Sequence, residues 1–178
     1  MGTGTKSDFE PFIIAIIGLL AGALFWLSHA PFWQSLALFV NLYVLALYDW
    51  RSFRLPNSLT ATLFLSGAVY LVTTPDLDVF HHIIGSTAGL LFFPTLNSIY
   101  KRLRGRDGIG MGDAKLLAGI GLWLGWQALP HVLLAASLTG LLYAGGRSVS
   151  MGKIASTTKL PFGVFLCFAT WLIWLFLM

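Results

Sequence analysis

Long apolar segments, separated by short polar or proline-containing gaps, dominate the pattern of this chain. Seven of them cover residues 12–28, 32–48, 59–74, 79–100, 113–127, 128–145 and 160–178. Most approach the roughly 17–25 residues that an α-helix needs to cross a bilayer. The fifth and sixth are short and almost fused, with Gln127 and Pro130 marking a tight turn. The pattern predicts an all-α, polytopic transmembrane helix bundle of about seven spans.

Composition agrees with a membrane protein. Of the 178 residues, 57% are hydrophobic and only 10% are charged, and the mean hydropathy is +0.79. Soluble domains carry about 25% charged residues. We predict a single membrane-embedded domain over residues 1–178, with a polar tail at 1–11 and a first segment that is retained rather than removed as a signal.

The distribution of charge predicts the topology. The net charge of +4 would suit a nucleic-acid binder, but the basic residues lie in the short gaps between apolar segments. With the amino terminus inside, seven spans place all 11 Lys and Arg on the cytoplasmic side, as the positive-inside rule requires. We therefore predict an N-in, C-out orientation and no nucleic-acid partner. The outer loops would hold Asp76, Asp78, His29, His81, His82 and His131.

Two aspartates lie where membrane helices are predicted to end. Asp49 follows the second segment and Asp113 begins the fifth, so both fall at the cytoplasmic boundary. For each alone, an interfacial helix cap is an equal alternative, although only Asp113 has the favourable amino-terminal position. Carboxylates at the edge of hydrocarbon are costly and usually functional. Together the two predict a water-activating dyad, in which one carboxyl keeps a proton and the other acts as a base.

The helix ends also predict which carboxyl holds the proton. The positive end of the fifth segment should lower the proton affinity of Asp113, and the negative end of the second should raise that of Asp49. We therefore predict Asp113 ionised and Asp49 protonated at rest, with Arg51, Arg54 and Lys115 as the charges that could reverse this order.

Three glycines, Gly108, Gly110 and Gly112, alternate just before Asp113. Their spacing fits neither a dinucleotide fingerprint nor a phosphate-binding loop. Alternating glycines let an extended backbone run close to another backbone, as a peptide substrate requires. The plainer alternative is a flexible loop that enters a helix.

Other polar positions have mainly structural interpretations. Pro56 is expected to start the third segment, with Asn57 and Ser58 as capping residues. Lys115 is either an interfacial anchor or a contact to substrate or carboxylate. The lone Cys167 is an apolar filler that can form neither an intrachain disulfide nor a Cys-pair metal site.

Three ordered motifs resemble the type IV prepilin peptidases, bacterial members of the GxGD group of membrane aspartyl proteases. Residues 49–60 resemble the first-aspartate block, in which an Asp precedes a Leu-Pro-Asn/Asp-x-Leu-Thr turn. Residues 107–116 (DGIGMGDAKL) resemble the block of the second aspartate, and residues 160–166 (LPFGVFL) resemble the Pro-Phe-Gly block that opens the last helix. The similarity covers roughly residues 32–178.

The resemblance implies an aspartic endopeptidase with Asp49 and Asp113 as its catalytic pair and with no metal or cofactor. It implies cleavage of the short basic leader of prepilin or pseudopilin precursors, which carry a transmembrane helix, at the cytoplasmic face of the bacterial inner membrane. The candidate substrate-binding or supporting positions are Gly108, Gly110, Gly112, Lys115, Arg51, Pro56, Asn57, Pro161, Phe162 and Gly163.

The chain departs from many members of that family in two ways. It has neither the cytoplasmic insert nor the paired cysteines associated with N-methylation, so it resembles the short, peptidase-only branch of Tad/Flp-type systems and predicts no methyltransferase domain and no zinc. Arg51 stands where many relatives have a second acid, which favours Asp49 as the reactive residue.

Three alternatives remain at this point. A signal-peptide-peptidase or presenilin-like protease matches Tyr48-Asp49 and GMGD, but residues 160–162 replace its Pro-Ala-Leu element. A proton-coupled transporter would place ionisable groups near the middle of the bilayer. A non-catalytic assembly subunit would need neither aspartate.

Overall fold

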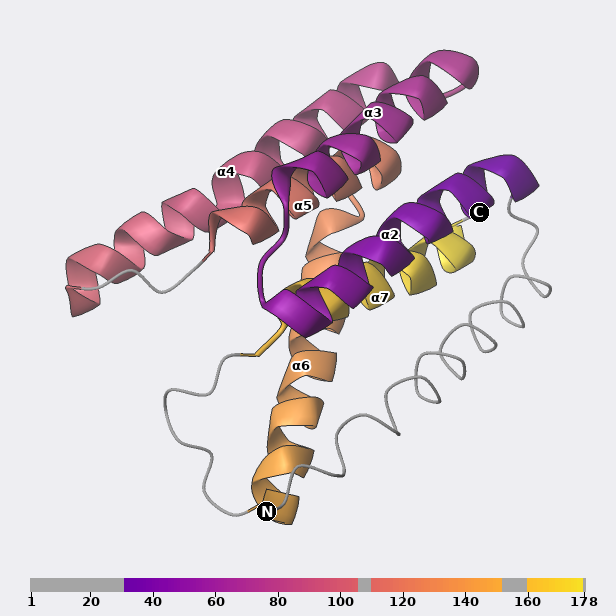
Figure 1. The fold of residues 1–178 in the computed structure, drawn as a ribbon. Coiled ribbons are helices and arrows are strands. Elements are labelled where there is room, and N and C mark those ends of the chain that lie inside the picture. The colour runs from indigo at the N-terminus through magenta and orange to yellow at the C-terminus, as the bar shows by residue number, and fades with distance from the viewer. Residues whose placement is uncertain (1–30, 106–109, 152–159, 178) are drawn as a thin grey trace.

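The computed structural model describes residues 31–105, 110–151 and 160–177. These residues form helices joined by short turns, with no strand among them (Figure 1). The helices are α2 (Phe32–Ser52), α3 (Asn57–Thr73), α4 (Val79–Arg104), α5 (Met111–Leu124), α6 (Leu129–Met151) and α7 (Phe162–Leu177). The predicted all-α fold is confirmed, while the first predicted segment, 12–28, lies outside the described residues.

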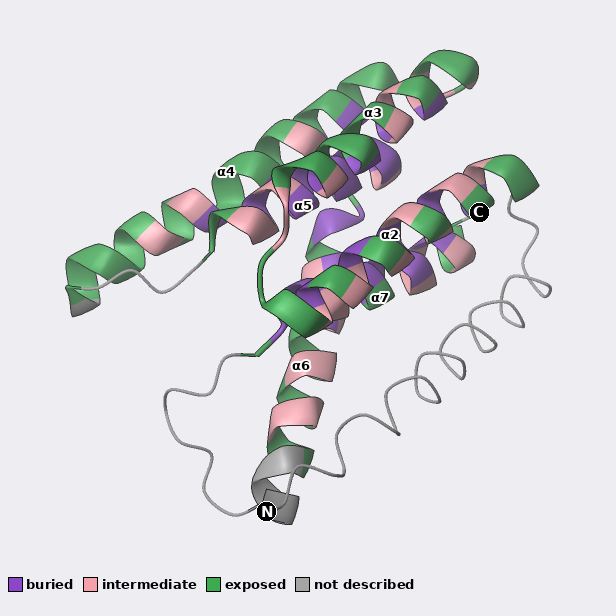
Figure 2. Ribbon diagram, in the orientation of Figure 1, coloured by how far each residue is buried: buried purple, intermediate pink, exposed green. Residues whose placement is uncertain are grey.

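Three of these helices are long and apolar enough to cross a membrane: Phe32–Ser52, Val79–Leu103 and Leu129–Gly146. Helices α3 and α7 are apolar but shorter. Figure 2 shows exposed residues along the outer faces of α3 and α4, and many of these residues are large and hydrophobic. An apolar outer surface is what lipid requires of a membrane protein. The count of seven spans and their orientation stay predictions.

Several boundaries and placements differ from the predicted ones, because polar residues continue the helices. α2 runs past Tyr48 to Ser52, so Asp49 lies inside its last turn. α5 begins at Met111, which makes Gly112 helical rather than extended. The prediction that histidines lie in outer loops is also wrong for those that the structure describes. His81 and His82 lie in α4, and His131 lies in α6.

The helix arrangement brings distant parts of the sequence to one end of the molecule. α5 packs against α3 and α4, α2 packs against α7 and α3, and α6 packs against α7. In Figure 1, the carboxyl end of α2 lies beside the amino end of α7 and leads through a short turn into α3, and the amino end of α5 lies beside α4, which runs on past it to the left. Below, this region is called the dyad end, because Asp49 and Asp113 lie there.

Glycines allow α4 and α5 to pack with their backbones in contact. A Cβ atom on Gly121 would collide with the backbone carbonyl of Gly85, and one on Gly89 would lie 2.5 Å from the carbonyl oxygen of Leu117. Small residues at such positions let membrane helices approach closely. The position of α5, and with it that of Asp113, therefore depends on this glycine contact.

An aromatic cluster joins α3, α5 and α7 toward the end of the molecule opposite the dyad, and it is hydrogen-bonded to α2. Tyr70 of α3 stacks on Trp123 of α5 with ring centroids 4.8 Å apart, and Trp174 of α7 meets Trp123 edge-on at 5.6 Å. The indole of Trp123 donates to the Leu63 carbonyl at 3.1 Å, and that of Trp174 donates to the Ser35 hydroxyl of α2 at 2.8 Å. Buried indole N–H groups with partners make this a well-specified core.

Candidate active site

Asp49 is a buried carboxylate held by another helix. It is only 5% exposed, in the last turn of α2. Its Oδ2 atom accepts a hydrogen bond from the backbone N–H of Val164 at 3.2 Å, and the backbone N–H of Gly163 also donates to this carboxylate. Both donors belong to the first turn of α7, and the Val164 N–H is shared between Asp49 and the Pro161 carbonyl, which it meets at 3.3 Å. The amino terminus of α7 is thus a binding site for the Asp49 side chain.

This contact explains why glycine occupies position 163. A Cβ atom there would lie 2.8 Å from Asp49 Oδ2 and 3.0 Å from its Cγ, too close for the carboxylate to keep its place. Pro161 precedes α7, and Phe162 is its first residue, with its ring 6.0 Å from that of Phe93 on α4. The Pro-Phe-Gly stretch, predicted from a motif alone, therefore positions the α7 amino terminus against Asp49.

Asp113 comes to the same place from α5. It lies in the first turn of that helix and is half-buried. It lies close enough to Asp49 for the two carboxyl groups to influence each other electrostatically. The structure therefore brings together the two aspartates that the sequence singled out. Among the described residues, no hydrogen-bond donor is seen on the Asp113 carboxylate.

Leu55 packs between the first turns of α5 and α7, at Gly112 and Gly163. A Cβ atom on Gly112 would lie 3.2 Å from the Cβ of Leu55, and one on Gly163 would lie 3.2 Å from its Cδ1. Sequence reasoning missed Leu55, because a single leucine in a turn carries no signal of its partners. It also interpreted Gly112 as part of an extended strand beside substrate, whereas the structure uses this glycine for helix packing.

Lys115 forms a contact that neither sequence interpretation included. Its Nζ donates to Asn57 Oδ1 at 2.7 Å, which joins α5 to the first residue of α3. The expected capping role of Asn57 is wrong, because Pro56 is the N-cap residue of α3 and no side chain caps this helix. The pair instead links the helix that carries Asp113 to the turn that follows the helix of Asp49.

The remaining predicted positions have fewer contacts. Gly110 is the N-cap residue of α5, in extended conformation, with open space where a Cβ would be. Arg51 is exposed in the last turn of α2. Gly108 lies outside the described residues.

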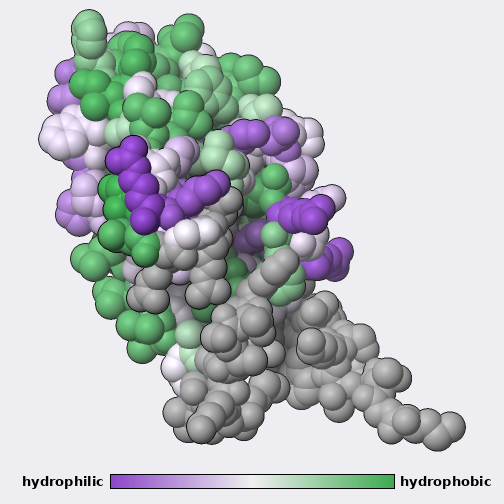
Figure 3. All heavy atoms as spheres, turned by 90° about the vertical axis from the view of Figure 1, so that its left-hand side faces the viewer, coloured by the Kyte–Doolittle hydropathy of each residue, from purple (hydrophilic) through white to green (hydrophobic). Residues whose placement is uncertain are grey.

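A hollow of about 680 Å³ opens beside the Asp49 turn. Its lining comes from the end of α2 and the turn into α3: Tyr48, Ser52, Phe53, Arg54, Leu55, Pro56 and Asn57. Figure 3 views the molecule from this side and shows hydrophilic side chains gathered across the middle of the face, with hydrophobic ones above them. The hollow therefore lies on a polar surface next to the turn that follows Asp49, while Asp49 itself is not part of its lining.

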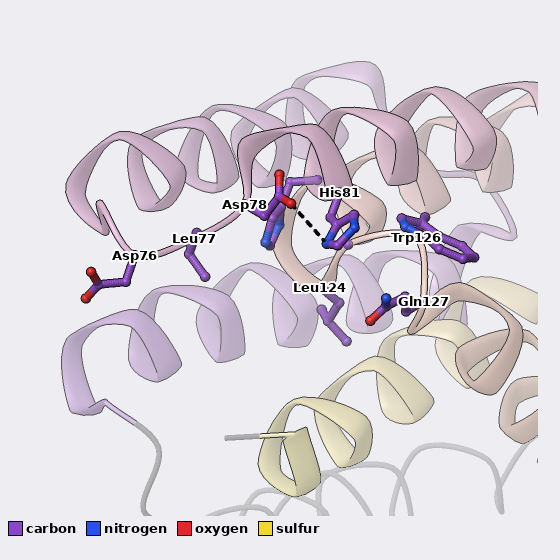
Figure 4. Close-up of a pocket in the computed structure, with 9 residues that line it drawn as sticks. Asp76, Leu77, Asp78, His81, Leu124, Trp126 and Gln127 are labelled. Carbon is purple, nitrogen blue, oxygen red and sulfur yellow. Dashed lines mark ion pairs between the residues drawn. The ribbon is translucent and has the colours of Figure 1, made fainter.

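A smaller pocket, of about 230 Å³, lies at the other end of α5 (Figure 4). Here Asp78 caps α4 by accepting from the backbone N–H of Phe80 at 3.0 Å, and His81 lies 3.6 Å from it. The ring of the buried His82 donates from Nδ1 to the Leu122 carbonyl at 2.8 Å. Within residues 31–105, 110–151 and 160–177, no cluster of three or more His, Cys, Asp or Glu side chains could hold a metal ion.

Comparison with known proteins decides the family. A model of the type IV leader peptidase family matches residues 36–145, more than half of the chain. The chain belongs to the type IV leader peptidase family. The matched span contains both aspartates, Asn57 and Lys115, whereas the Pro-Phe-Gly stretch lies beyond it.

Curated relatives of this leader peptidase family carry the name prepilin leader peptidase/N-methyltransferase. The protein from Pectobacterium carotovorum subsp. carotovorum is 36% identical over 130 residues, 73% of this chain and 47% of that protein. The one from Aeromonas hydrophila is 34% identical over 165 residues, 91% and 56% of the two chains. The one from Burkholderia pseudomallei (strain K96243) is 38% identical over 151 residues, 83% and 48%.

The chain spans about half the length of the curated relatives it matches. No solved structure matches it. The expected absence of a methyltransferase domain stays a prediction. The resemblance to prepilin peptidases, drawn from three motifs, is confirmed.

Proposed function

We propose that this chain is an aspartic endopeptidase that removes the basic leader from type IV prepilin-like precursors at the cytoplasmic surface of the inner membrane. The observation that carries this proposal is the meeting of two carboxylates, Asp49 from α2 and Asp113 from α5, at one end of the helices. The family supplies the class of substrate. The mechanism we infer takes these two carboxyl groups as a pair of acids of the kind that activates water.

In the mechanism we propose, Asp49 is the ionised base and Asp113 carries the proton. The backbone N–H of Val164 in α7 donates to Asp49 Oδ2, whereas no donor to Asp113 is seen among the described residues, and hydrogen bonds to a carboxylate favour its ionised form. This reverses the assignment made from the sequence, which considered only the helix that bears each residue. The amino end of α7 favours a negative charge on Asp49, whereas the carboxyl end of α2, which bears the residue, disfavours it.

The proposed reaction has two steps. Asp49 takes a proton from water, the water oxygen bonds to the scissile carbonyl carbon, and Asp113 gives its proton to the carbonyl oxygen. The carbon–nitrogen bond then breaks, the leaving nitrogen takes the proton held by Asp49, and the hydroxyl proton returns to Asp113. The products are a free carboxyl group on the leader and a free amino group on the mature chain.

The proposed topology places this pair on the cytoplasmic side, with about seven spans and the amino terminus inside. Support comes from the basic residues of α2 to α5 and their turns. Those within the described ranges lie at the dyad end: Arg51, Arg54, Lys101, Arg102, Arg104 and Lys115. Asp76 and Asp78 lie at the opposite end, in the α3–α4 turn. Positive charge on one side is the usual mark of the cytoplasmic face.

The topology can be tested by labelling single cysteines in sealed vesicles, in a Cys167→Ala background. Arg54→Cys should react with a membrane-impermeant thiol reagent only from the cytoplasmic side, and Asp76→Cys only from the outer side. Labelling of both from one side would contradict the proposed topology.

The activity can be tested with the purified chain in detergent micelles and a prepilin-like precursor that keeps its basic leader and transmembrane helix. We expect one cut at the leader junction, identified by the masses of both fragments. Asp76→Asn, a change in the distant turn, should cleave at the wild-type rate. An intact precursor after long incubation with folded wild-type protein would contradict the proposed function.

A further inference from the structure

The turn that joins α2 to α3 is tied to the backbone of Asp49. α2 ends at Phe53, whose φ and ψ of 51° and 32° are left-handed and whose N–H donates to the Asp49 carbonyl at 2.9 Å. The Ser52 hydroxyl, in the last turn of α2, is 3.2 Å from the Arg54 carbonyl, within hydrogen-bond distance. These contacts fix the start of the turn relative to Asp49.

Leu55 is the residue of this turn that packs into the molecule. Its side chain is partly buried and lies against the hydrophobic core, whereas Phe53 and Arg54 are exposed. Its backbone is restricted from the other side as well, because the residue before a proline is confined to extended conformations. Pro56 follows it directly, as the N-cap residue of α3. The Leu55 side chain therefore projects from a turn with little freedom.

The first contact of Leu55 is with the start of α5. A Cβ atom on Gly112 would have Leu55 atoms as its three nearest neighbours outside the α5 backbone: Cβ at 3.2 Å, and Cδ1 and the backbone nitrogen at 3.7 Å each. The α5 backbone thus rests directly on Leu55. Asp113 is the next residue, and consecutive Cα atoms are about 3.8 Å apart. The position of Leu55 therefore limits where Asp113 can lie.

A second contact joins the same turn to the same face of α5. Lys115 Nζ donates to Asn57 Oδ1 at 2.7 Å. Gly112 and Lys115 are three positions apart, so they lie on one face of the helix. A helix held at two points on one face cannot rotate about its axis without losing one of them. The apolar contact at Leu55 and the polar one at Asn57 together set the direction in which Asp113 leaves α5.

The third contact of Leu55 is with the glycine that lies against the Asp49 carboxylate. A Cβ atom on Gly163 would lie 3.2 Å from Leu55 Cδ1 and 2.8 Å from Asp49 Oδ2. The Leu55 methyl group and the Asp49 carboxylate thus both pack against Gly163 at the start of α7. One side chain touches both the helix that carries Asp113 and the surface on which Asp49 rests.

We propose that Leu55 is a positioning residue for precursor cleavage, a spacer that sets the distance and the angle at which Asp113 faces Asp49. The inference rests on the proposed function. Leu55 takes no part in proton transfer, and it acts through the two carboxyl groups. Loss of its side chain leaves space into which α5 and the Asp49 carboxylate can shift, and small displacements of catalytic groups are costly.

The test compares three Leu55 variants in the precursor-cleavage assay, on protein that is folded. Leu55→Ala removes the atoms that reach Gly163, so kcat should fall about tenfold while KM stays within about twofold. Leu55→Met keeps nearly the same volume, so its kcat should stay within about threefold of wild type. Leu55→Val shortens the side chain less than alanine does, and its kcat should lie between those of the other two variants.

Leu77→Ala is the matched control. Leu77 is also a leucine in a turn between helices, partly buried against the same core, but it lies in the α3–α4 turn at the far end of the molecule. Both alanine variants should lower the melting temperature by similar amounts, because each leaves unfilled space at the edge of the core. Leu77→Ala should keep the wild-type kcat, which separates positioning from a general loss of packing.

A second readout combines Leu55→Ala with Asp113→Asn. If Leu55 acts through the carboxyl pair, its loss should lower the residual rate of Asp113→Asn by less than about twofold, because residues that act as a unit are not additive. Wild-type kcat in folded Leu55→Ala and Leu55→Val proteins would overturn this inference alone. A raised KM with unchanged kcat would also overturn it, in favour of a substrate contact. No cleavage by the wild-type protein would overturn the proposed function and this inference with it.

Discussion

The two ends of α5 both carry acidic and buried polar residues, but these residues are held in different ways. At the far end, Asp78 caps its own helix and lies beside His81 one turn on. At the dyad end, Asp49 is buried and receives its hydrogen bonds from α7, more than a hundred residues later in the chain. An acid that serves its own helix has a structural explanation. A buried acid held by another helix, next to a second acid, is a candidate for catalysis.

The buried histidine of the far end sharpens this contrast. His82 is buried like Asp49, at 8% exposed. Its ring, however, donates a hydrogen bond to a backbone carbonyl and so joins α4 to α5. The nearby pocket therefore has polar walls whose groups already serve the fold. A pocket with polar lining is a weaker sign of catalysis than two carboxyl groups that the fold brings to one place.

Among changes outside the two aspartates themselves, the largest effect should come from adding one methyl group at Gly163. Gly163→Ala places a carbon atom within 2.8 Å of Asp49 Oδ2, so the carboxylate must move. Because small misplacements of catalytic groups are costly, we expect kcat to fall about a hundredfold with little change in KM. Gly145→Ala on α6, where nothing lies within 4 Å, is the control. Wild-type kcat in a correctly folded Gly163→Ala protein would refute the role of this contact.

Loss of one backbone donor should have the next largest effect. Val164→Pro removes the N–H that donates to Asp49 in the first turn of α7, a region where proline is tolerated. Hydrogen bonds to charged groups contribute about 1.5–3 kcal/mol, so kcat should fall about tenfold or more. Val164→Ala keeps the N–H and should remain close to wild type. Equal rates for the two variants would show that the α7 donors do not assist catalysis.

The Lys115–Asn57 pair should behave as one unit. Lys115→Ala and Asn57→Ala each break the same hydrogen bond between α5 and α3, so we expect each to lower kcat about tenfold. In a double-mutant cycle the second change should add little, since residues in contact are not additive. Fully additive losses would mean that Lys115 acts on substrate or carboxylate independently of Asn57.

The smallest effect on catalysis should come from His82. His82→Ala leaves the Leu122 carbonyl without its partner and should lower the free energy of unfolding by about 1–3 kcal/mol. The cleavage rate per folded molecule should be unchanged. His82 lies in α4, beside the end of α5 that is away from the aspartates. A thermal melt alongside the cleavage assay separates these two quantities. A lower kcat in folded His82→Ala protein would show that the two ends are coupled.

The sequence predicted the parts of the site that depend on topology alone. Asp49 ends one apolar segment and Asp113 starts another, and alternating spans place those ends on one side. The boundary of α2 was drawn too early because hydrophobicity stops at Tyr48 while the helix continues through polar residues. The same reliance on polarity put His82 in a loop, although a single hydrogen bond allows its ring to be buried inside α4.

Contacts between side chains and other helices could not be predicted in this way. The α7 donors reach Asp49 across 115 positions of sequence, and Lys115 reaches Asn57 across 58. Such pairs depend on how the helices pack, which the glycine contact between α4 and α5 helps to set. For this reason the Pro-Phe-Gly motif had only a general supporting or substrate-binding role in the sequence interpretation, and the order of the two carboxylates was argued from the helix that bears each one.

The most direct test of the central claim is the single-turnover rate of precursor cleavage by Asp49→Asn and Asp113→Asn, measured on protein that melts like wild type. We predict that each substitution lowers the rate about a thousandfold or more, and that the double substitution lowers it no further. Cleavage at near the wild-type rate by either variant would contradict a mechanism based on the two aspartates.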